Sequence, residues 1–169
     1  MNKIQSWQEL PFNKYIELSK ITKTDELEKT IEYVAIINDL TIDEVREMKA
    51  KEFQILTEEI KFLNENPDFT KSTYQWKFKE MENITMDEFI TYEKLKGDED
   101  SMSYIVSFMT NTPENKIKEM SSTDVLYAFF LLKAHLDRFI KHLMQSLLWE
   151  VTKEKLNKKV KKLQFWRKN

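Results

Sequence analysis

Apolar residues recur three or four positions apart through most of the chain, and this spacing predicts amphipathic helices. Stripes of this kind are Phe12, Tyr15, Ile16 and Leu18; Leu27, Ile31, Val34 and Ile37; and Phe53, Leu56, Ile60 and Leu63. From residue 123 to about residue 164 no glycine or proline interrupts the pattern, so we expect a long C-terminal helix. The pattern predicts a mainly α-helical protein.

Helix start signals lie where these stripes begin. Thr41-Ile-Asp-Glu44 and Thr85-Met-Asp-Glu88 are capping boxes, in which the threonine hydroxyl accepts from the glutamate amide and the glutamate reaches back. Residues 22–25 and 121–124 carry further start signals, and Thr112-Pro113 places a cap residue before a proline. These signals set the helix boundaries.

The apolar pattern occurs twice. Residues 10–18 match residues 84–92, an offset of 84 − 10 = 74, and residues 34–48 match residues 106–120, an offset of 120 − 48 = 72. A period near seventy residues suits a duplicated helical module. We therefore expect two related modules, 1–68 and 69–148, followed by an arm over 149–169.

A minor β element is predicted between the modules. Tyr74, Trp76 and Phe78 alternate with polar residues, which is the period of a half-buried strand. The matching place in the first module is residues 4–7. The two segments would pair as a two-stranded ribbon packed beside the helices.

Composition limits the chemistry. The chain of 169 residues has one glycine and no cysteine. Phosphate-binding loops, dinucleotide fingerprints and nucleophile elbows need glycines, and thiolate chemistry needs cysteine. Two histidines seven residues apart, His135 and His142, fit partly buried helix positions better than a zinc site, and acidic pairs such as Glu58 and Glu59 fit solvated helix faces. We expect a protein that is not an enzyme and has no cofactor or metal, although an enzyme with a pocket between the modules is a third possibility.

Charge is distributed unevenly. Residues 149–169 hold eight Lys/Arg and two Glu, a net of +6, which leaves 27 − 8 = 19 basic and 29 − 2 = 27 acidic residues elsewhere, a net of −8. A solvated helix end accounts for such an arm. A basic amphipathic segment also binds partner grooves, anionic membranes or nucleic acid, and a protein partner is favoured here. The predicted partner-binding residues are Leu156, Val160, Leu163, Phe165, Trp166, Lys158, Lys159, Lys161, Lys162 and Arg167.

A secondary candidate surface is formed by Tyr74, Trp76 and Phe78. Interleaved with Lys77 and Lys79, these aromatics are similar to a stacking platform for single-stranded nucleic acid. The alternation is more typical of a strand with one face on the core. No apolar stretch approaches the length of a membrane span, and no apolar run follows a basic start, so we expect neither a transmembrane segment nor secretion.

One stretch of the chain resembles a known group. The chain is similar to small proteins encoded in structural gene clusters of tailed bacteriophages over Trp7-Gln-Glu-Leu-Pro-Phe-Asn-Lys-Tyr15, residues 34–45, and residues 53–56 through Phe62-Leu63. It differs from that pattern at Asn38-Asp39, where the pattern often has a glycine. Several such proteins are tail assembly chaperones or minor virion proteins.

The resemblance implies a bacteriophage tail or virion assembly protein acting through protein–protein contacts. Its partners would be other phage structural proteins or further copies of itself. It would work in the host cytoplasm during assembly, and retention in the virion is left open. The alternative is a nucleic-acid-associated or packaged virion protein that uses the basic arm.

Overall fold

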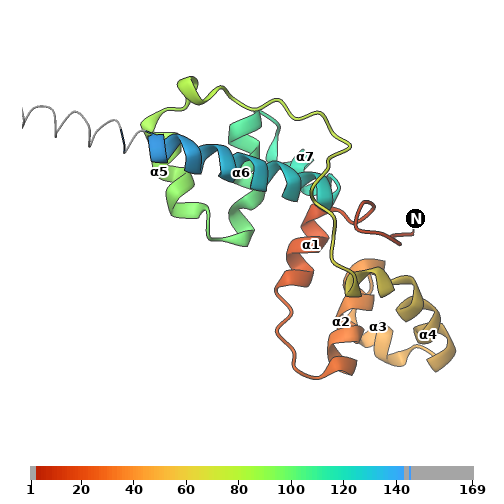
Figure 1. The fold of residues 1–169 in the computed structure, drawn as a ribbon. Coiled ribbons are helices and arrows are strands. Elements are labelled where there is room, and N and C mark those ends of the chain that lie inside the picture. The colour runs from red at the N-terminus through yellow and green to blue at the C-terminus, as the bar shows by residue number, and fades with distance from the viewer. Residues whose placement is uncertain (1–2, 143–144, 146–169) are drawn as a thin grey trace, which may run out of the picture. The chain divides into compact units, whose positions relative to one another are not determined.

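The computed structural model describes residues 3–142 and residue 145, and these residues are mainly helical (Figure 1). The α-helices are α1 (Phe12–Ser19), α2 (Glu26–Asn38), α3 (Ile42–Glu47), α4 (Ala50–Glu59), α5 (Met86–Leu95), α6 (Met102–Thr110) and α7 (Glu114–Glu119). Short 3-10 helices are η1 (Lys61–Asn64), η2 (Met81–Asn83) and η3 (Glu99–Ser101). Residues 122–142 form a further helix. The mainly α prediction is confirmed.

The chain divides into two compact units, residues 1–132 and residues 133–169. In the second unit the described residues, 133–142 and 145, are helical. The predicted extension of the last helix to about residue 164 lies outside the described residues. The division into modules 1–68 and 69–148 with an arm over 149–169 stays a prediction.

Local capping chemistry sets several helix starts as expected. Both capping boxes form: the Thr41 hydroxyl accepts from the Glu44 amide at 3.2 Å, and Thr85 and Glu88 make the same pair at 3.2 Å. Asp25 caps α2 by accepting from the backbone amide of residue 28 at 2.9 Å. These short-range bonds satisfy amides that have no partner within their own helix.

The apolar stripes of the first helices meet in one core. Helix α2 lies beside α1, α3 and α4 (Figure 1). The buried cluster between them consists of Leu10, Leu18, Ile31, Val34, Ala35, Ile37, Val45, Ile60 and Phe62. Helix α6 packs against α5 and α7, and its Ile105, Val106 and Met109 are fully buried. Removing this apolar surface from water is the main force that holds these short helices, which would be marginal alone.

Backbone hydrogen bonds join two parts of the first unit that are distant in sequence, residues 10–12 and residues 120–122. The Phe12 amide donates to the Met120 carbonyl at 2.9 Å, and the Ser122 amide donates to the Leu10 carbonyl at 2.7 Å. These bonds surround an isolated antiparallel bridge between Pro11 and Ser121. The entry to α1 is thereby tied to the start of the helix at residue 122.

The predicted two-stranded ribbon is wrong, because the described residues contain no strand at either position. Residues 6–9 form a turn in which the Glu9 amide donates to the Ser6 carbonyl at 3.1 Å. Residues 75–80 form neither a helix nor a strand, and the Lys79 amide donates to the Met109 carbonyl at the end of α6, at 2.8 Å. The Ser6 carbonyl and the Lys79 amide, which a ribbon would use, are therefore bound to other partners.

The predicted internal duplication is not supported by the structure. Helices at matching places differ in length: α1 has 8 residues and α5 has 10, while α2 has 13 and α6 has 9. One local feature recurs, since Asp39 after α2 and Asn111 after α6 both have positive φ, 55° and 53°. Each is followed by a six-residue helix. Asn38-Asp39 stand where the phage-protein pattern often has glycine, and the left-handed backbone of Asp39 is a conformation that glycine adopts easily.

Candidate functional site

The predicted partner-binding residues of the 149–169 arm all lie outside the described residues, so that prediction stays a prediction. The secondary candidate surface is described. Tyr74, Trp76 and Phe78, which we call the aromatic row, lie between η1 and η2 on a segment of the first unit that is neither helix nor strand. Tyr74 is exposed, and the other two members are half-buried.

The three rings of the aromatic row contact one another in sequence. The Tyr74 and Trp76 ring centroids are 4.7 Å apart in an edge-on arrangement, and those of Trp76 and Phe78 are 6.4 Å apart with nearly parallel planes. The Lys116 ammonium lies 6.0 Å from the centroid of the Tyr74 ring. The alternation therefore does place the three side chains together, although no strand is present.

A single carboxylate fixes the beginning of this segment. Asp124, in the first turn of the helix formed by residues 122–142, is only 6% exposed. Its Oδ1 accepts from the Ser72 hydroxyl at 2.6 Å and from the Thr73 amide at 2.7 Å, and its Oδ2 accepts from the Thr73 hydroxyl at 2.9 Å. The Tyr74 amide adds a longer contact at 3.4 Å. We call this group of bonds the Asp124 clamp.

The clamp reaches the aromatic row directly. The Trp76 indole Nε1 donates to the Ser72 hydroxyl at 3.1 Å, and that hydroxyl donates to Asp124. A partly buried indole N–H normally needs such an acceptor. The orientation of the Trp76 ring is thus linked to a helix about fifty residues later in the chain.

The other end of the segment is held as well. Besides the amide bond from Lys79 to Met109, the Lys79 ammonium contacts the Glu88 carboxylate at 2.5 Å. That hydrogen bond is the main reason why the pKa of Glu88 lies below its usual value, with the Thr85 amide contributing next. The segment that carries the aromatic row is therefore fixed at both ends, by the Asp124 clamp and by the contacts of Lys79.

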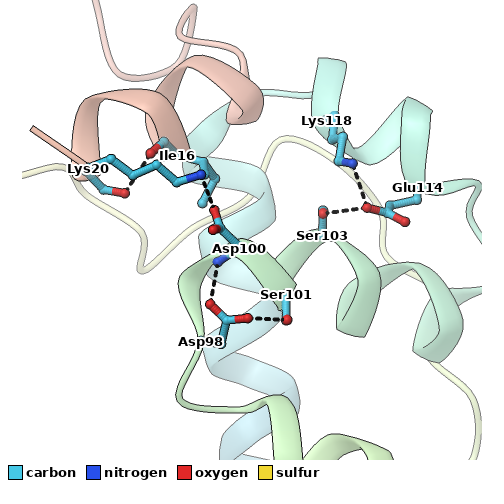
Figure 2. Close-up of polar contacts among 9 residues, drawn as sticks. Ile16, Lys20, Asp98, Asp100, Ser101, Ser103, Glu114 and Lys118 are labelled. Carbon is cyan, nitrogen blue, oxygen red and sulfur yellow. Dashed lines mark hydrogen bonds and ion pairs between the residues drawn. The ribbon is translucent and has the colours of Figure 1, made fainter.

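A cleft elsewhere in the first unit gathers charged groups from the α1 region, η3 and α7, together with the Ser103 hydroxyl of α6 (Figure 2). It has a volume of about 340 Å³. The Lys20 ammonium pairs with Asp100 at 2.6 Å, across from α1 to η3. On the neighbouring elements, Glu114 accepts from Lys118 at 2.7 Å and from the Ser103 hydroxyl at 3.1 Å.

These pairings make the carboxyl groups at the cleft unsuited to acid catalysis. The hydrogen bond from Lys118 is the largest cause that lowers the pKa of Glu114, and the Ser103 hydroxyl adds to it. A carboxyl group held ionised is a poor proton donor near neutral pH. Asp98 likewise accepts from the Ser101 hydroxyl at 2.5 Å and from the Asp100 amide at 3.2 Å (Figure 2). The cleft joins helices through satisfied polar contacts.

Sequence reasoning missed the most connected polar residue of the candidate surface. Asp124 is visible in the sequence only as part of a helix start signal, and its partners are 50 to 52 residues away. The two histidines, expected to be partly buried, are both exposed. Among the described residues no group of three or more acidic, histidine or cysteine side chains is arranged to hold a metal ion.

The comparisons with known proteins return nothing: no family model matches the chain, and neither a curated protein nor a solved structure is detectably similar to it. Within the described residues, no helix combines the length and the apolar character that crossing a membrane requires.

Proposed function

We propose that the protein is a non-enzymatic assembly protein that binds other proteins through the aromatic row. In line with the bacteriophage resemblance of residues 4–65, this activity would serve the building of a tail or virion, in the host cytoplasm. The partners would be other structural proteins of the same particle or further copies of the chain.

The observation that carries the proposal is the Asp124 clamp. Ordering a flexible aromatic segment on binding costs conformational entropy, which weakens the complex. Here Ser72 and Thr73 are already bonded to Asp124, and the Lys79 amide is bonded to α6. A row of aromatics that is held in place before binding is suited to act as an interface anchor, since tryptophan and tyrosine dominate binding hot spots.

The arrangement of the rings supports a protein partner over single-stranded nucleic acid. Bases stack on aromatic faces that are open to them. In the aromatic row, Trp76 has Tyr74 against one side and Phe78 nearly parallel to it, and the Lys116 ammonium lies over the Tyr74 ring. Such a compact row presents edges and partial faces to a neighbouring surface.

A second candidate function follows from the charge of residues 149–169, where eight Lys/Arg stand against two Glu. In this alternative the chain is a nucleic-acid-associated accessory protein or a packaged virion protein. It predicts DNA binding whose affinity falls steeply with salt, because each neutralised phosphate releases counterions. Docking through aromatic side chains would depend much less on salt.

Two exposed tyrosines provide a matched test of the proposed function. Tyr74 is 37% exposed in the aromatic row, and Tyr104 is 46% exposed on α6. We expect Tyr74→Ala to weaken association with structural proteins encoded beside this chain by about tenfold, and Tyr104→Ala to leave it unchanged. Affinity would be measured by native mass spectrometry and calorimetry on the full chain. Equal affinities of both variants and the wild type would refute the role of the aromatic row.

A further inference from the structure

A groove in the first unit lies away from the aromatic row, beside the junction of α2 and α3. It has a volume of about 460 Å³, which is within the range of binding pockets, roughly 300–1,000 Å³. Its apolar lining comes from the end of α2 and the start of α3: Ala35, Ile36, Leu40 and Ile42. Ile42 is 41% exposed, so this apolar surface is open to a partner.

The backbone between α2 and α3 creates the groove. Asp39 takes the left-handed conformation, and the Leu40 amide donates back to the Ala35 carbonyl at 2.9 Å. This is a Schellman motif, in which apolar residues on either side of the helix end approach each other. Thr41 then starts α3 at once through its capping box. Two tight local motifs therefore hold Leu40 and Ile42 at the mouth of the groove.

The polar lining is acidic. Glu17 of α1, Glu32 of α2 and Asp39 supply three carboxyl groups, and none of the described residues that line the groove is a cation. Asp39 pairs with the buried Lys14 at 2.8 Å, and Glu32 contacts Lys23 at 3.6 Å, but neither lysine lines the groove. The first turn of α3 adds two more exposed carboxyl groups, those of residues 43 and 44.

We propose that this groove binds a basic amphipathic helix of a partner protein. A helix that presents leucine-like side chains along one stripe would cover the apolar lining, and lysines or arginines flanking the stripe would face Glu17, Glu32 and Asp39. Charge complementarity selects this occupant, because no cation lines the described groove: an acidic helix would bring like charges together, and a neutral one would gain nothing from the carboxyl groups that line it. The groove is independent of the aromatic row and adds a second contact surface.

An NMR titration of the full chain tests the proposal. The probe is a synthetic peptide made of two copies of the sequence LKKLLKL, which places leucines along one helix face. We expect the amide resonances of residues 35–42 and of Glu17 to shift on addition of this peptide. A peptide in which glutamines replace the lysines, and one of identical composition in the alternating order LKLKLKL, should each bind about fivefold more weakly or worse.

Matched variants locate the site. Glu17→Lys and Ile42→Ala should each weaken the binding of the basic peptide by about fivefold. Their controls are Glu82→Lys, an exposed glutamate away from the groove, and Ile55→Ala, an isoleucine that is 50% exposed on α4. The controls should bind as the wild type does, and so should Tyr74→Ala, which separates this result from the test of the aromatic row.

Several outcomes would overturn the proposal. They are no binding, shifts confined to other residues, equal binding of the glutamine or alternating peptides, and unchanged affinity in Glu17→Lys and Ile42→Ala. Sedimentation of the chain alone covers a further case: self-association that Ile42→Ala abolishes would mean that the groove is filled by a second copy and not by a partner's basic helix.

Discussion

Replacing Asp124 by alanine should release the aromatic segment and destabilise the fold. The substitution removes the acceptor for the Ser72 hydroxyl, the Thr73 amide and the Thr73 hydroxyl, at 2.6, 2.7 and 2.9 Å. A hydrogen bond to a charged group contributes about 1.5–3 kcal/mol when considered alone. Because the three bonds share one carboxylate and water can replace some of them, the contributions do not add. We expect a total loss of about 3 kcal/mol in the free energy of unfolding.

Two assays report this loss. Thermal unfolding followed by circular dichroism should show a melting temperature lower by about 6–12 °C, using roughly 2–4 °C per kcal/mol for a chain of this size. Hydrogen exchange should show that the amides of residues 73 and 74 lose protection far more than those of α2 and α6. The second measurement separates local release of the segment from general destabilisation.

Two controls define the result. Asp124→Asn keeps the size of the side chain and one carbonyl acceptor, so its effect should be smaller, about 1 kcal/mol. Asp137→Ala, at an exposed position of the last helix, should leave both assays unchanged. If Asp124→Ala kept the wild-type melting temperature and the wild-type protection of residues 73 and 74, the reasoning about the clamp would be refuted.

Three further predictions concern single residues. Lys14→Met, which removes the bonds from the buried ammonium to the Ile37 carbonyl and to the Asp39 carboxylate, each at 2.8 Å, should lower the free energy of unfolding in urea by about 1–2 kcal/mol. Asn111→Ala should destabilise by about 1 kcal/mol because its φ is 53°, whereas Asn111→Gly in the same urea assay should be as stable as the wild type or more so. The pKa of Glu88 is lowered mainly by Lys79, so the ionised Glu88 carboxylate stabilises the fold above the ordinary carboxyl value of 4.5, and this stabilisation is lost as pH falls through the lower pKa of the folded state. As pH falls below about 4.5, the melting temperature of Glu88→Gln should therefore decrease less steeply than that of the wild type.

Each of these predictions has its own contradicting result. Unchanged stability of Lys14→Met would mean that the buried ammonium does not support the end of α2. Asn111→Gly less stable than Asn111→Ala would contradict the assigned backbone conformation. For the pH series the control is Glu82→Gln, and a Glu88→Gln profile parallel to the wild type would contradict the assigned pKa shift.

The sequence predicted what local chemistry controls. The boxes at Thr41 and Thr85 depend on residues three positions apart, so they could be recognised without knowledge of the fold. Helical spacing of apolar residues predicted the mainly α class for the same reason. These features depend on neighbours along the chain.

The prediction of strands was wrong because the pairing of a segment is determined by contacts that are distant in sequence. Alternation at Tyr74, Trp76 and Phe78 shows only that their side chains point to one side, and an extended segment without a partner strand does this equally well. Whether its amides meet another strand depends on Asp124 and Met109, which are remote in sequence. The clamp could not be predicted because its partners are about fifty residues apart, and the acidic groove could not because Glu17 of α1 meets the junction of α2 and α3 only in the packed fold.

The most direct test of the central claim is a hydrogen-exchange footprint of the full chain, alone and mixed with the proteins that its neighbouring genes encode. If the aromatic row is the binding surface, amides of residues 72–79 gain protection in the mixture, and Tyr74→Ala reduces that gain while Tyr104→Ala does not. A stable complex that leaves residues 72–79 as exposed to exchange as in the free chain would contradict the account.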